Sequence, residues 1–194
     1  APFVFPTPTE FVDLPSQGKF YPAGHVLHNV DSLEIRFMTA KDEDILTSQA
    51  LLRKGIALDR FLQNVLVDKT VRIDDLLTGD KNALIVKSRI TGYGAEYSTT
   101  VSCPTCWSKQ EYEFDLEDST LITADDLINN GVNIQGDGTI LFELPITKAS
   151  VSIKMMNGRD EKELARKQSL NKKVNHQDTS LTDQLKMLIV SVNG

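Results

Sequence analysis

The residues of this chain best suited to chemistry are two cysteines, Cys103 and Cys106, in the sequence C-P-T-C. They lie between residues 97–103 and 110–116, two segments whose alternating pattern is typical of β-strands. A tight turn between two strands directs both sulfur atoms to the same side, as in a zinc knuckle. A structural zinc site takes four ligands, and the chain has no other cysteine, so this pair is a half site for a metal.

The source of further ligands stays open at this point. His25 and His28 have an H-x-x-H spacing, so a Cys₂His₂ site is chemically feasible, although two surface histidines in a turn are the simpler interpretation. A segment beyond residue 194 is a better source of ligands, and an empty turn fits the sequence equally well. A redox role is disfavoured, because a reactive C-x-x-C has its first cysteine at a helix N-terminus.

The acidic residues give no sign of a catalytic carboxylate pair. Residues 42–44, 74–75 and 125–126 are interpreted as solvated acids at helix starts, where the helix dipole favours negative charge. The sequence contains no phosphate-binding glycine loop, zinc-protease motif or nucleophile elbow. These observations favour a protein that is not an enzyme.

Composition narrows the choice of partners. The 194 residues are 40% hydrophobic and 25% charged, which is ordinary for a globular chain that folds without disulfides. A net charge of −6 argues against direct contact with nucleic acid or an anionic membrane surface. No apolar run reaches the roughly 18 residues of a membrane span. We therefore expect a protein made in a reducing cytoplasm that contacts other proteins.

Residues 1–30 are expected to form an extended N-terminal docking arm. Prolines are concentrated there, and proline favours extended geometry. The arm is also rich in aromatic residues, which free tails usually lack, so it should dock on its own body or on a neighbouring chain. Trp107, beside the cysteines, is either a packing lid or an exposed interface anchor. The expected partner-binding residues are Phe3, Phe5, Phe11, Phe20, Tyr21 and Trp107.

The sequence predicts an α+β fold, with a helical body and an antiparallel β section that carries the C-x-x-C knuckle. Residues 31–94 should hold a strand and helices, 95–156 the β-rich section, and 157–194 the C-terminal helices. The first helix should begin at Thr39 and continue to about Arg53. The other expected elements are the strands 32–37, 139–144 and 150–155 and the helices 57–67, 79–91, 157–170 and 181–190.

Several stretches, in this order, resemble one family of phage proteins. The residues that carry the resemblance are 11–22, 38–46, 79–84, 89–97 with the knuckle, and 189–194. Together they are similar to the baseplate hub assembly proteins of contractile-tailed bacteriophages related to the T-even phages. The resemblance implies a tail protein rather than an enzyme, and contacts with other hub or tail proteins. It also implies a longer chain with a second C-x-x-C, so that a zinc ribbon cannot close with residues 1–194 alone.

The function expected from these observations is a structural or assembly protein of the phage tail baseplate, in its hub region. As a late protein, it would assemble in the host cytoplasm and reside in the virion tail, acting by protein–protein docking. The alternative is a zinc-ribbon assembly chaperone that is absent from the finished virion. The sequence leaves self-association open.

Overall fold

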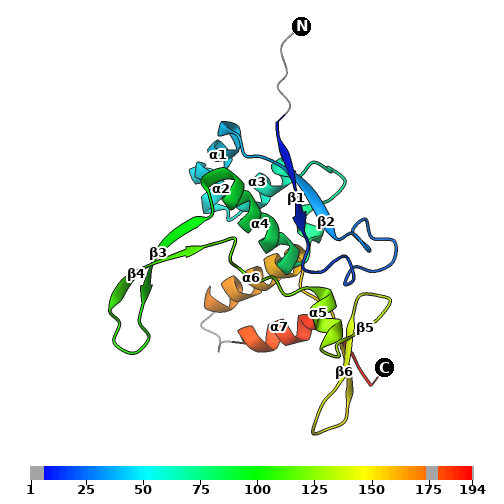
Figure 1. The fold of residues 1–194 in the computed structure, drawn as a ribbon. Helices are drawn as coiled ribbons and strands as arrows, with labels where there is room; N and C mark the ends of the chain where they lie inside the picture. The colour runs from blue at the N-terminus through cyan, green and yellow to red at the C-terminus, as the bar shows by residue number, and fades with distance from the viewer. Residues whose placement is uncertain (1–6, 174–178, 194) are drawn as a thin grey trace.

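The computed structural model describes residues 7–173 and 179–193 (Figure 1). The fold combines helices with antiparallel sheets, so the predicted α+β class is confirmed. The first sheet pairs β1 (Thr9–Asp13) with β2 (Ser32–Arg36) in antiparallel register. On β2, Leu33 and Ile35 point into the core, as the alternating pattern of this strand predicts.

Helices α1 (Ala40–Thr47), α2 (Gln49–Arg53) and α3 (Ala57–Val65) follow β2. The single helix expected from Thr39 to Arg53 is wrong, because Ser48 has extended backbone geometry (φ −62°, ψ 109°) and separates α1 from α2. The apolar face of α3 is buried at Phe61, Leu62 and Val65. A short 3₁₀ helix, η1 (Ile73–Asp75), then leads to α4 (Thr78–Tyr93).

The core receives a large contribution from the N-terminal segment. Leu14, Phe20, Tyr21 and Leu27 are all buried together with residues of α3 and α4. Residues 7–30 form β1 and a series of turns that lie on the body, which is one of the two docking places expected for the N-terminal arm. The physical reason is that this segment carries enough apolar surface to offset the entropic cost of ordering it.

A long β-hairpin projects from the body, consisting of β3 (Glu96–Ser102) and β4 (Lys109–Asp115) (Figure 1). Its strands match the two alternating segments around the cysteines. Nearly all of its residues are exposed, and it forms a separate two-stranded sheet.

The C-terminal part contains α5 (Ala124–Asn129) and a four-stranded sheet. Its strands, in spatial order, are β5 (Asn133–Ile134), β6 (Ile140–Glu143), β7 (Ser150–Ile153) and β8 (Ile189–Val192). The helices α6 (Gly158–Lys173) and α7 (Ser180–Leu188) lie between β7 and β8 in the chain. The helix expected through residue 190 ends earlier, because the β-branched run at 189–192 forms β8 on the edge of β7.

Within the residues that the structure describes, no helix combines the length and apolar character that crossing a membrane requires.

Candidate docking surfaces

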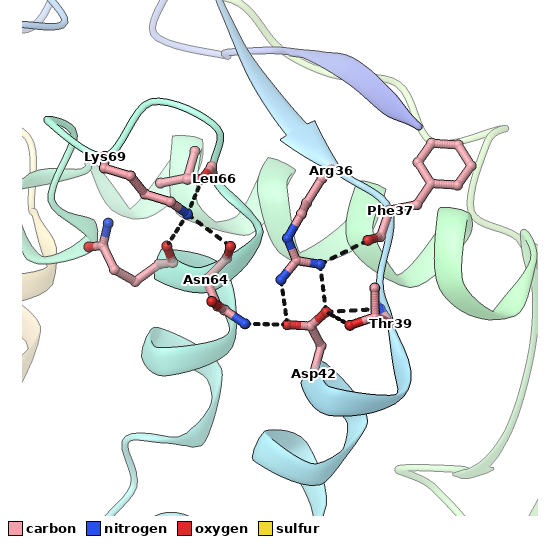
Figure 2. Close-up of polar contacts among 8 residues, drawn as sticks. Arg36, Phe37, Thr39, Asp42, Asn64, Leu66 and Lys69 are labelled. Atoms are coloured by element: carbon pink, nitrogen blue, oxygen red, sulfur yellow. Dashed lines mark hydrogen bonds and ion pairs between the residues drawn. The ribbon is translucent and has the colours of Figure 1, made fainter. Parts of the chain in front are cut away.

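Two buried carboxylates organise the polar contacts of this fold. The first is Asp42, whose carboxylate is fully buried (Figure 2). Arg36 donates two hydrogen bonds to it, at 2.7 and 2.8 Å. The backbone N–H and the hydroxyl of Thr39 donate at 2.8 and 2.7 Å, and the side-chain amide of Asn64 donates at 2.6 Å. Both carboxylate oxygens are therefore engaged, and the cluster joins β2, α1 and α3.

The interpretation of Asp42 as a solvated acid is wrong. Burial alone would raise the pKa of this carboxyl group, but the hydrogen bonds from Arg36, Thr39 and Asn64 outweigh burial and hold the pKa well below its usual range. Glu43 and Asp44 are exposed, as expected for the first turn of a helix. Asp42 thus has a structural role, because its acceptor positions are occupied by the protein itself.

Lys69 closes the end of α3 beside this cluster (Figure 2). Its ammonium group donates to the backbone carbonyls of Gln63 and Asn64, at 3.1 and 2.9 Å, and to that of Leu66. Burial and the nearby Arg36 lower the pKa of Lys69. A lysine at this position satisfies carbonyl groups that the helix itself leaves unpaired.

A second buried carboxylate, Asp80, fixes the N-terminal segment to α4. It accepts hydrogen bonds from the backbone N–H and hydroxyl of Ser16, at 3.0 and 2.7 Å, and from the Tyr21 hydroxyl at 2.7 Å. The Tyr21 hydroxyl in turn accepts from the backbone N–H of Leu77 at 3.0 Å. Burial and the adjacent Asp80 raise the pKa of Tyr21.

This arrangement corrects the prediction that Phe20 and Tyr21 bind a partner. Both side chains lie in the core of this chain and offer almost no surface to another protein. The backbone of Phe20 is also in close contact with the turn at Gly138, where an added Cβ would lie 2.3 Å from the Phe20 carbonyl oxygen. Phe3 and Phe5 lie outside the described residues, so their role stays a prediction.

The other acidic pairs act within the fold. Asp126 accepts from the backbone N–H and hydroxyl of Thr123 and forms a capping box at the start of α5. Asp125 pairs with Lys19, which joins α5 to the N-terminal segment. In η1, residues 74–75 pair with residues of α6.

Phe11 is the predicted partner-binding residue of β1 that remains on the surface, with 65% of its area exposed. It lies at the mouth of a groove of about 620 Å³ between β1, α4 and residues 116–122. Val86 and Ile90 line the α4 side of this groove, and Ile122 lines the opposite side. An exposed aromatic ring beside an apolar groove is suited to protein–protein contact.

The cysteine pair lies at the tip of the β3–β4 hairpin. The backbone N–H of Trp107 donates to the Cys103 carbonyl, and that of Cys103 donates to the Ser108 carbonyl, each at 2.9 Å. Both thiols are free, and Cys106 is exposed. Hydrogen bonds from Ser108 and Cys103 lower the pKa of the Cys106 thiol, which favours the thiolate form.

Two thiols cannot by themselves fill the tetrahedral shell of zinc. Among the described residues, no group of three or more histidine, cysteine or acidic side chains is arranged to hold a metal ion. His25 accepts from the backbone N–H of Leu27 and stacks on the Tyr21 ring, and the imidazole of His28 bonds to the Tyr21 carbonyl. The residues of this chain described here therefore do not fit a closed Cys₂His₂ site.

Trp107 is 77% exposed at the hairpin tip. The packing-lid interpretation of this residue is wrong, because the ring covers no core. Its backbone has a left-handed conformation (φ 58°), which is uncommon for a bulky residue. The exposed ring leaves the interface-anchor interpretation as a prediction.

The fold and its exposed apolar surfaces define a small α+β protein without a recognisable catalytic constellation in its described part. A comparison with known protein families identifies the family to which this chain belongs. Residues 7–141, more than half of the chain, match a family described as T4 bacteriophage base plate protein. The chain belongs to this family, and is a structural protein of the phage tail baseplate that interacts with other tail proteins. No curated protein and no solved structure matches the chain.

Proposed function

We propose that this protein is a structural subunit of the baseplate hub and that it acts by docking other tail proteins onto apolar surfaces. The observation that carries the baseplate location is the family match over residues 7–141. The exposed Phe11 and its groove supply a surface of the right kind. The hub location rests on the resemblance seen in the sequence, and docking rests on these exposed surfaces.

The edge of β1 supports docking at Phe11. The bonds from Phe37 N–H to the Pro8 carbonyl and from Leu14 N–H to the Asp31 carbonyl flank the β1–β2 ladder. Antiparallel alternation then directs the backbone groups of Phe11 away from β2, and no hydrogen bond among the described residues uses them. A neighbouring subunit could bond to this edge while it fills the groove.

The test is a phage in which the gene carries Phe11→Ala. We expect the isolated protein to fold normally, because this ring is exposed, while its association with tail proteins falls by about 2 kcal/mol, the size of an interface anchor. Ile146→Ala is the matched control, since Ile146 is 91% exposed on a turn of the C-terminal sheet. Normal tail assembly with Phe11→Ala would reject docking at this surface.

The proposed function includes zinc binding only under one condition, which concerns the source of the ligands. Cys103 and Cys106 would supply two ligands only if further ligands come from outside the described residues. The rival function, a zinc-ribbon assembly chaperone, has the same half site but would be absent from finished particles.

A further inference from the structure

The β3–β4 hairpin has two chemically different faces. On one face lie the aromatic rings of Tyr97, Tyr112 and Phe114, whose centroids are 5.1 Å apart for Tyr97–Phe114 and 5.8 Å apart for Tyr112–Phe114. The other face carries one lysine, Lys109, and three acids, Glu111, Glu113 and Asp115 of β4, because successive side chains of a strand alternate between faces. Tyr112 is 57% exposed and Phe114 is 40% exposed, so the aromatic face covers no core.

The outer edge of β4 is unpaired. The bonds from Cys103 N–H to the Ser108 carbonyl and from Leu116 N–H to the Ala95 carbonyl fix the alternation of the β3–β4 ladder. By this alternation, the N–H and C=O groups of Glu111 and Glu113 point away from β3. No hydrogen bond among the described residues uses these backbone groups. An edge of this kind is a template for an added strand.

The outer edge of β3 is less accessible at its base. There the Arg89 guanidinium donates to the carbonyls of Gly94 and Glu96, at 2.8 and 3.3 Å, and lies over the Tyr93 ring. Arg89 thus covers an outward carbonyl of β3. This asymmetry favours β4 as the edge that receives a strand.

The charges on the hairpin define the chemistry of that strand. No ion pair involving Glu111, Glu113 or Asp115 occurs among the side chains that the structure describes. A residue of an added strand directly opposite Glu111 or Glu113 lies on the acidic face, and its neighbours lie beside Tyr112 and Phe114. A second copy of β4 would place acid against acid, which is unfavourable.

We infer that the outer edge of β4 binds an extended segment of another protein in which basic and apolar side chains alternate. Main-chain hydrogen bonds to Glu111 and Glu113 would supply affinity. Their carboxylates would select the basic positions, while the rings of Tyr112 and Phe114 would contact the apolar ones. This inference rests on the proposed docking function and names a second surface, distinct from the Phe11 groove.

The test uses the full-length protein and two fluorescently labelled peptides, one alternating valine and lysine and one alternating valine and glutamate. Binding is followed by fluorescence anisotropy. We expect the valine–lysine peptide to bind at least about tenfold more tightly, with an affinity that falls as salt is added. Equal binding of both peptides, or binding of neither, would overturn the inference.

Paired proline variants test the edge itself. Ser98 and Glu113 are direct cross-strand partners, so each carries an outward backbone N–H on its own strand. Glu113→Pro removes the donor on the β4 edge and should abolish binding of the valine–lysine peptide, whereas Ser98→Pro, its control on β3, should retain it. Equal losses in both variants would overturn the choice of β4.

A charge variant tests whether the carboxylates select the basic peptide, separately from the main-chain hydrogen bonds that bind either peptide. Glu111→Lys balances the two acids that remain on this edge, Glu113 and Asp115, against two lysines, so it should abolish most of the preference for the valine–lysine peptide, whereas Glu96→Lys, on β3, should leave that preference unchanged. Slow hydrogen exchange at Glu111 and Glu113 in the protein alone would show an edge that is already covered, and would also overturn the inference. The Phe11→Ala assembly test is independent, so docking at the groove can stand even if the hairpin binds neither peptide.

Discussion

Asp42 shows how much one buried side chain contributes to this fold. Asp42→Ala would leave the Arg36 guanidinium, the Thr39 N–H and the Asn64 amide without their acceptor. We expect a loss of about 3 kcal/mol in the free energy of unfolding, as for one partner removed from a buried ion pair. Urea denaturation measures this loss.

The control for this substitution is Asp44→Ala, which removes an exposed acid from the same helix. It should cost only about a few tenths of a kcal/mol, through the helix dipole. Equal effects of the two substitutions would show that Asp42 is solvated after all, as the sequence alone suggests.

The lowered pKa of Asp42 predicts a specific pH dependence. A carboxyl group whose pKa is lower in the folded state contributes its full stability above its ordinary pKa of 3.8, and this contribution is lost as the pH falls toward the folded-state pKa. The wild-type protein should therefore lose more stability than Asp42→Asn when the pH is lowered from about 5 to about 3. Urea unfolding at both pH values checks this, and parallel losses in the two proteins would contradict it.

At the residue scale, the sequence allowed a partial prediction of the polar clusters. Thr39 and Asp42 have the spacing of a capping box, and the helix start there is confirmed. The burial of Asp42 could not be predicted, because it depends on Arg36 from β2 and Asn64 from α3, which only the tertiary fold brings together. The burial of Tyr21 likewise depends on Asp80, 59 residues away.

The turn at residues 136–138 shows how a single element is held on the body. Gly138 has φ +83°, and a Cβ there would meet the Phe20 carbonyl. Gly138→Ala should therefore cost clearly more than Gly131→Ala, where φ is +88° and nothing lies within 4 Å. The second substitution carries only the left-handed backbone cost of about 1 kcal/mol.

Thermal unfolding of the two glycine variants measures the difference. A larger loss for Gly138→Ala supports close packing of the turn on Phe20. If both variants lose the same stability, the turn does not pack on Phe20 in solution.

The hairpin tip gives a prediction about metal. A protein of residues 1–194 should bind zinc weakly or not at all, because two thiolates complete only half of the coordination shell. Zinc content after dialysis against a chelator checks this, with Cys103→Ser as the control. One equivalent of chelator-resistant zinc in the unmodified protein, lost in Cys103→Ser, would assign ligand roles to His25 and His28.

At the element scale, the alternating pattern predicted the two strands of the hairpin. Periodicity did not predict the break at Ser48 or the strand β8, because the local sequence pattern does not determine the backbone conformation at these two places. The run at 189–192 continues the apolar pattern of α7, but pairing with β7 makes it a strand. Edge pairing of this kind is a tertiary effect and overrides local propensity.

At the scale of the whole molecule, the family match over residues 7–141 confirms that the chain is a baseplate protein, while the hub location implied by the resemblance stays a proposal. The predicted docking arm does not have the same support. Its residues Phe20 and Tyr21 lie in the core, so the surface available to partners is shifted to Phe11 and the hairpin. The sequence could not show this, because a segment rich in proline and aromatic residues has the same composition whether it covers its own body or a neighbour.

Mass spectrometry of purified phage particles shows whether this chain is part of the assembled baseplate. We expect peptides of this chain in intact virions and in isolated baseplates, in a constant ratio to the other baseplate proteins. The same peptides should be depleted from particles that carry Phe11→Ala. A chain that is abundant in infected cells but absent from purified particles would contradict a structural role and would favour an assembly chaperone.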